Sequence, residues 1–257
     1  MSLPMTAGLA QAICALAIVL VLPFIDLPRT RQLKRHSSSQ ARMSLYRHGI
    51  AKTWIALATV VACSGYQRLF VIPRYPGDLP WLDGRPWLYA FATALMAVYF
   101  SLALWPGLHC MLNRRMRPRY AKAIRSLRFI SPVSRKERRW WIVVSVTAGV
   151  TEELLFRGFL LEYLRGHLDG GPHLSLTLAW LLSSVAFGIG HAYQGWVGIM
   201  RTASAGLAFG LLAILTGNLV LPILLHCLID LQVLAIYHPE IDAPEEAAAL
   251  TAGCNCE

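Results

Sequence analysis

Charged residues are scarce in this chain of 257 residues, in which Asp, Glu, Lys and Arg together make up only 15%. A soluble domain carries about 25% charged residues. Hydrophobic residues fill the deficit and account for 56% of the chain. This composition argues against a string of soluble domains and predicts a single domain that lies largely in lipid.

Several short motifs are also absent. The six cysteines form no Cys-x-x-Cys pair, so the sequence indicates neither a structural zinc site nor a dithiol redox motif. The His-Glu-x-x-His motif that identifies many zinc proteases is missing as well. The chain has only four lysines but twenty arginines, and it contains no Asn-x-Ser/Thr sequon. We interpret this bias as typical of a bacterial protein of the inner (cell) membrane.

Seven hydrophobic stretches are long enough to cross a bilayer, which takes about 20 mostly apolar residues in a helix. The stretch 50–70 is the least apolar of them because it contains Lys52, Gln67 and Arg68. We predict an all-α, polytopic membrane bundle of about seven transmembrane helices, with a range of six to eight. The predicted spans are residues 5–25, 50–70, 86–112, 140–163, 173–191, 196–215 and 218–237.

Basic residues gather in two segments of the chain. Seven lie between Leu27 and Lys52, and eleven lie between Asn113 and Arg139, where Glu137 is the only acid. Alternating helices place both segments on one side, and positive loops stay cytoplasmic. We therefore expect the N-terminus outside the cell and the C-terminus in the cytoplasm. The basic loops would meet anionic lipid headgroups, and nucleic acid is not expected as a partner because no stacking aromatics or known binding module accompany the charge.

The second basic segment has an amphipathic pattern. Tyr120, Ile124 and Leu127 recur at helical spacing among lysine and arginine residues. This pattern is compatible with an interfacial helix lying on the membrane, and equally with a solvated basic loop.

Six ionisable residues are candidates for positions deep inside the hydrophobic stretches, with Arg201 nearer an end of its stretch. Each costs about 2.5–3.5 kcal/mol at the centre of a bilayer, so such residues are functional candidates by default. Glu153 and Arg157 are four residues apart and share one helix face, which makes an ion pair geometrically natural. The same spacing relates His226 to Asp230, and Phe187 to His191. The six residues are Glu152, Glu153, Arg157, His191, His226 and Asp230.

Three motifs carry a family resemblance. The stretch TAGVTEELLFRGFL contains Glu-Glu-x-x-x-Arg, FGIGH contains Phe-x-x-x-His, and TGNLVLPILLHCLID contains His-x-x-x-Asp. The three motifs occur in this order, and each lies inside a hydrophobic span. Together they resemble the motifs of the CPBP family of glutamic intramembrane proteases. That family includes the CAAX prenyl endopeptidases and bacterial Abi-type proteins. The resemblance covers about residues 138–231.

The resemblance implies a catalytic role for four residues. Glu152 would be the general base that activates a water molecule, and His191 would help to hold its proton. His226 and Asp230 would face the substrate carbonyl, while Glu153, Arg157 and Phe187 would support the site. Many family members have Asn where this chain has Asp230. Asp230 must therefore be protonated, orient His226 or bind a metal, and we expect it to orient His226.

The resemblance implies no cofactor, but a divalent metal stays an alternative. Glu152, His191, His226 and Asp230 are all legitimate zinc ligands, and three of them with a water would make a catalytic zinc site. The family chemistry, in contrast, is described as metal-independent for some members.

These observations predict three parts of the chain and one leading function. Residues 1–139 would form N-terminal transmembrane helices with basic cytoplasmic loops, 140–237 a catalytic helical core, and 238–257 an acidic, disordered tail. The function would be hydrolysis of a peptide bond in a membrane-associated substrate. Two alternatives remain: a non-catalytic membrane protein of the same family, acting in bacteriocin immunity or as a scaffold, and a proton-coupled transporter, which also uses buried carboxylates and histidines.

Overall fold

The computed structural model describes residues 5–70, 72 and 84–237, and every regular element within them is helical. The prediction of a disordered tail at 238–257 concerns residues outside this set. The N-terminal helix α1 (Met5–Leu16) continues through a π-helical stretch, Ala17–Val21, into α2 (Leu22–Ile25). Helix α3 (Leu27–Arg35) follows after Asp26, and α4 (Ser39–Ser64) runs back beside it to a 3-10 turn at Tyr66–Phe70.

The remaining elements are also consecutive helices. They are α5 (Pro86–Leu112), α6 (Arg117–Ala123) between 3-10 turns at Arg114–Met116 and Arg125–Leu127, α7 (Arg135–Glu153), a π-helical stretch at Leu154–Leu160, α8 (Leu161–His167), α9 (Gly171–Ile189), a 3-10 turn at Ala192–Gln194, α10 (Trp196–Thr216), α11 (Val220–Leu231) and α12 (Val233–Ile236).

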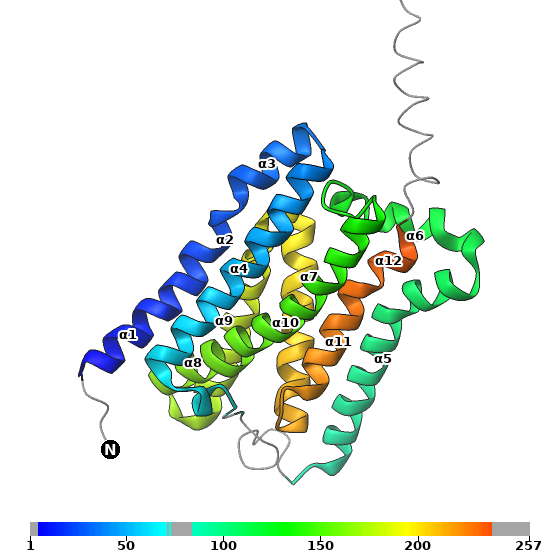
Figure 1. The fold of residues 1–257 in the computed structure, drawn as a ribbon. Coiled ribbons are helices and arrows are strands. Elements are labelled where there is room, and N and C mark those ends of the chain that lie inside the picture. The colour runs from blue at the N-terminus through cyan, green and yellow to red at the C-terminus, as the bar shows by residue number, and fades with distance from the viewer. Residues whose placement is uncertain (1–4, 71, 73–83, 238–257) are drawn as a thin grey trace, which may run out of the picture.

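The long helices alternate in direction, so that α3, α6 and α12 lie at the same end of the bundle (Figure 1). Hydrogen bonds join the connections at this end. Lys34 Nζ donates to the carbonyl of Tyr193, and Arg201 donates to the carbonyl of Ala123. Both basic segments are therefore at one end of the molecule, as the alternation of spans predicts.

Four helices are long and apolar enough to cross a membrane, and the protein is a helical integral membrane protein. These helices are Gly8–Arg35, Pro86–Leu112, Gly171–Ile189 and Trp196–Thr216. They include or overlap the predicted spans 5–25, 86–112, 173–191 and 196–215. The predicted spans 50–70, 140–163 and 218–237 lie in helices that are shorter or more polar. The number seven therefore stays a prediction.

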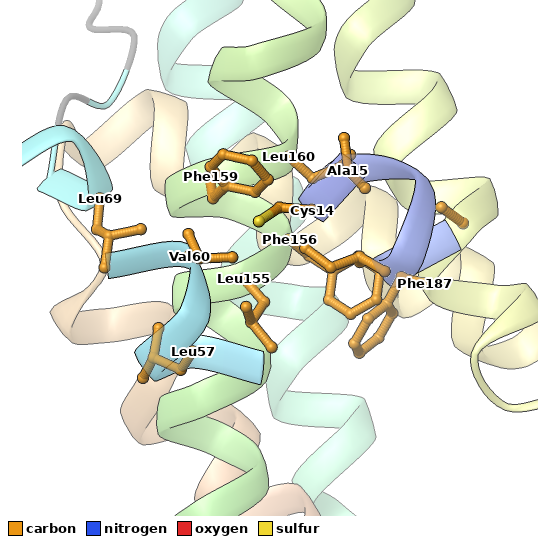
Figure 2. Close-up of a cluster of buried hydrophobic side chains, with 12 residues drawn as sticks. Cys14, Ala15, Leu57, Val60, Leu69, Leu155, Phe156, Phe159, Leu160 and Phe187 are labelled. Atoms are coloured by element: carbon orange, nitrogen blue, oxygen red, sulfur yellow. The ribbon is translucent and has the colours of Figure 1, made fainter. Parts of the chain in front are cut away.

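The N-terminal helices pack directly against the helices that carry the three motifs. Figure 2 shows one buried cluster at this contact, in which α1, α4 and α9 surround the π-helical stretch that follows α7. Lipid is as apolar as the side chains themselves, so close packing rather than exclusion of water holds such helices together. The labelled members of the cluster are Cys14, Ala15, Leu57, Val60, Leu69, Leu155, Phe156, Phe159, Leu160 and Phe187.

The amphipathic pattern of the second basic segment does not form one continuous helix. Helix α6 ends at Ala123, and a 3-10 turn follows it. Ile124 and Leu127 are partly buried and pack against a cluster that includes Trp141. Their apolar side chains therefore face the protein, because the turn at Ile124 bends the chain back over the ends of the other helices.

Candidate functional site

Helix α7 carries both motif glutamates in its last turn. Glu152 and Glu153 end the α-helical part, and the π-helical stretch Leu154–Leu160 begins with the next residue. Such π-helical stretches occur frequently at functional sites. The predicted ion pair is present, since Arg157 donates from Nη1 to Glu153 Oε1 at 3.0 Å.

Arg157 contacts residues of three different helices. Its side chain is 2% exposed, and its second terminal nitrogen donates to the carbonyl of Gly206 in α10 at 3.2 Å. The guanidinium lies over the ring of Phe187 in α9, 4.1 Å from the ring centroid. A buried guanidinium needs both a counter-charge and hydrogen bonds, and Glu153 and Gly206 supply them. The Glu153–Arg157 pair thus fixes the helices around the site.

His226 in α11 is oriented by the same pair. Its Nδ1 lies 2.9 Å from Glu153 Oε1, and an ionised carboxylate only accepts hydrogen bonds. The Nδ1 atom therefore carries the proton and donates. The imidazole also stacks on Phe209, with ring centroids 5.1 Å apart and planes inclined at 19°. These contacts direct Nε2 toward Glu152.

Asp230 lies beside His226 without a direct hydrogen bond, because its Oδ2 is 3.8 Å from His226 Nε2. The hydrogen bond that orients the ring comes instead from Glu153 in α7, at 2.9 Å from Nδ1. The role of Asp230 stays a prediction.

His191 approaches Glu152 from the other side. It lies in the turn just beyond the end of α9, where its Nδ1 is 2.9 Å from the carbonyl oxygen of Phe187. A carbonyl only accepts, so His191 also carries a proton on Nδ1. Its Nε2 is 3.9 Å from Glu152 Oε2.

Three predicted site residues thus meet around Glu152 Oε2, and Asp230 lies beside one of them, His226. Glu152 Oε2 is 3.9 Å from His191 Nε2 and 4.0 Å from His226 Nε2, and it has no hydrogen-bond partner within the described residues. Polar atoms separated by more than about 3.5 Å suit a bridging water molecule rather than a direct bond. The arrangement can hold one water between a carboxylate and two imidazoles.

The site opens onto a cavity of about 250 Å³. Glu152, His191 and Asp230 line it together with residues of α2, α3 and α4. Much of the lining is apolar and includes side chains such as Leu22 and Trp141. A substrate that enters this space leaves bulk water and meets the carboxylate directly.

Two glycines let the helices of the site approach closely. A Cβ atom on Gly149 would lie 2.4 Å from Cys227 Sγ, so α7 and α11 meet only because this residue has no side chain. A Cβ atom on Gly188 would lie 2.8 Å from Ala203 Cβ. The absence of a side chain at Gly188 therefore allows α9 to pack closely against α10.

No group of three or more His, Cys, Asp or Glu residues within the part of the chain that the structure describes is arranged to hold a metal ion. The zinc alternative stays a prediction.

Sequence reasoning missed two residues of the cavity wall. Asp26 and Lys52 both line the cavity and pair with each other. The available signals were that Asp26 is the first charged residue after the opening apolar stretch, and that Lys52 lies at the start of a predicted span.

A family model matches the part of the chain that carries these residues. Residues 135–232 match the family model described as type II CAAX prenyl endopeptidase Rce1-like. The matched segment runs from the start of α7 to the residue after α11 and contains all seven predicted site residues. No curated protein and no solved structure matches the chain. Over residues 135–232 the chain is therefore similar to the type II CAAX prenyl endopeptidases, and this match supports its resemblance to the CPBP family.

Proposed function

We propose that this protein is an intramembrane endopeptidase that hydrolyses a peptide bond of a membrane-associated substrate, using a water molecule activated by Glu152. The observation that carries the proposal is the convergence of Glu152 Oε2 with His191 Nε2 and His226 Nε2, at 3.9 and 4.0 Å. The family match supports peptide hydrolysis as the reaction.

Glu152 serves as the general base. Its Oε2 atom has no hydrogen-bond partner within the described residues, so it is free to accept a proton from water. His191 donates from Nδ1 to the carbonyl of Phe187, which leaves the Nε2 lone pair of the neutral ring to accept a hydrogen bond from the same water. Hydrolysis requires one group that takes a proton from the attacking water and a second group that holds this water in position.

His226 stabilises the oxyanion that forms when water attacks the carbonyl. Protonated on both nitrogens, it donates from Nδ1 to Glu153 and from Nε2 to the developing negative charge. The Glu153 carboxylate stabilises the imidazolium, and Asp230 adds a second negative charge 3.8 Å from Nε2. An ionised Asp230 would repel the oxyanion directly, so in this proposal it acts on His226 instead.

We further propose that the basic end of the bundle faces the cytoplasm of a bacterial cell and contacts anionic lipid headgroups. The support is the concentration of arginine and lysine in α3, α6 and the start of α7, which the positive-inside rule assigns to the cytoplasmic side. The N-terminus then lies outside.

The test is cleavage of membrane-tethered peptides by the purified protein in lipid vesicles, read by mass spectrometry. We expect Glu152→Gln to abolish cleavage while the protein stays folded, because the amide cannot take the proton from water. Glu162→Gln on α8 is the matched control, since Glu162 pairs with Arg165 on the same continuous helix and does not line the cavity. Cleavage by Glu152→Gln at the rate of the unmodified protein would overturn the proposal.

A further inference from the structure

A second polar cluster contributes Asp26 and Lys52 to the cavity that Glu152 lines. Lys52 Nζ in α4 pairs with Asp26 Oδ2 at 2.5 Å. His48 Nε2 lies 3.3 Å and Arg29 Nη1 lies 4.0 Å from the other oxygen of Asp26. The cluster belongs to the N-terminal helices, outside the segment that matches the family model.

Asp26 and Lys52 share one cavity with the proposed catalytic residues. Glu152 and Asp230 line the same cavity as these two residues. The lining also includes apolar side chains such as Leu22 and Ile50. A peptide bound in the cavity therefore meets both apolar and charged side chains.

The charges of the second cluster do not balance. One carboxylate, Asp26, faces the ammonium of Lys52, the guanidinium of Arg29 and the imidazole of His48. With His48 neutral, the cluster has a formal charge of +1. The excess charge belongs to Arg29, whose side chain is 48% exposed and does not line the cavity, whereas Asp26 and Lys52 line it and are 13% and 19% exposed. The ammonium of Lys52 also carries three hydrogen-bond donors, and Asp26 accepts one of them.

We propose that Lys52, held in place by Asp26, is an anion-binding subsite that recognises a carboxylate of the substrate peptide. The inference rests on the proposed function and deepens it, because the subsite would determine which peptides present a bond to Glu152. A cationic peptide would be repelled from the same position, so the subsite also excludes substrates.

The carboxylate could come from an acidic side chain or from the C-terminus of the peptide. Three peptides of otherwise identical sequence separate these sources: one with a free C-terminal acid, one with a C-terminal amide, and one with the amide and a glutamate near the C-terminus. We expect the unmodified protein to cleave at least one carboxylate-bearing peptide with a kcat/KM roughly 10- to 100-fold above that of the neutral amide, as expected for a charge-assisted hydrogen bond.

The test compares Lys52→Met with Lys136→Met, an exposed lysine in the first turn of α7 that does not line the cavity. Lys52→Met should abolish the preference for carboxylate peptides, and Lys52→Arg should retain it. Lys136→Met should behave as the unmodified protein.

Two further variants guard against misfolding, because Lys52→Met leaves the carboxylate of Asp26 without its nearest partner. Asp26→Asn/Lys52→Met removes both charges and should fold, but it should show no preference. Asp26→Asn alone frees the ammonium and should keep or increase the preference.

Binding to the Glu152→Gln variant separates the subsite from the reaction. Fluorescence anisotropy of the three peptides on this variant, with and without Lys52→Met, measures recognition alone. Carboxylate preference in binding that depends on Lys52 supports the subsite even where no cleavage occurs, and in that case only the proposed function fails. Equal binding of all three peptides, or a preference that survives Lys52→Met, overturns the subsite and leaves the endopeptidase proposal intact.

Discussion

Glu153 provides the sharpest test of the site, because its one carboxylate serves two partners. Its side chain is fully buried, and Oε1 accepts from Arg157 at 3.0 Å and from His226 at 2.9 Å. The substitution Glu153→Gln keeps an acceptor of the same shape but removes the charge. The guanidinium of Arg157 then stays buried without its counter-charge.

The expected loss of stability follows from this burial. Removing one partner of a buried ion pair costs about 3–5 kcal/mol, and we expect the lower value because the amide oxygen still accepts both hydrogen bonds. For a chain of this size about 3 kcal/mol corresponds to a fall in Tm of roughly 6–12 °C. Cleavage activity should fall at least about tenfold, since the imidazolium of His226 loses its stabilising negative charge.

The assay is thermal unfolding in detergent followed by tryptophan fluorescence, with Glu162→Gln as control. Glu162 and Arg165 form the same type of pair on the same helix, but their side chains are 29% and 24% exposed. Such a pair contributes about 0–1 kcal/mol, so Tm should change by only a few degrees. The double variant Glu153→Gln/Arg157→Met should regain stability without regaining activity. Equal Tm values for Glu153→Gln and Glu162→Gln would refute the reasoning.

Three other predictions follow from single contacts. Burial raises the pKa of Glu137, but hydrogen bonds from Arg42 and neighbouring groups lower it further, so the net pKa lies below the usual value of 4.5. Because the pKa of Glu137 is lower in the folded state, its ionised carboxylate stabilises the folded protein above pH 4.5, and this stabilisation is lost as the pH falls through the lowered pKa. When Tm is measured from pH 7 to pH 3, it should therefore fall less steeply for Glu137→Gln than for the unmodified protein. Gly149→Ala should lower both Tm and activity because its Cβ would overlap Cys227, whereas Gly166→Ala, with nothing within 4 Å, should leave both unchanged in the same assays. Cleavage should survive dialysis against a strong chelator, and loss of activity that added zinc restores would contradict the metal-free mechanism.

Local sequence determined the class of protein and the candidate residues. A hydrophobic run of sufficient length has few alternatives to a membrane helix, and an ionisable residue within such a run is costly enough to indicate a function. The spacing of four residues was sufficient to predict the ion pair of Glu153 with Arg157, since both lie on one helix. These inferences need only the geometry of a single helix.

Tertiary structure alone decided which side chains meet across helices. It assigned the orientation of His226 to Glu153 in place of Asp230, because the two residues are 73 positions apart and their approach depends on how α7 packs against α11. It also brought Asp26 and Lys52 into the cavity of Glu152. Contacts of this kind depend on the relative placement of whole helices, which glycines such as Gly149 permit and no local pattern specifies.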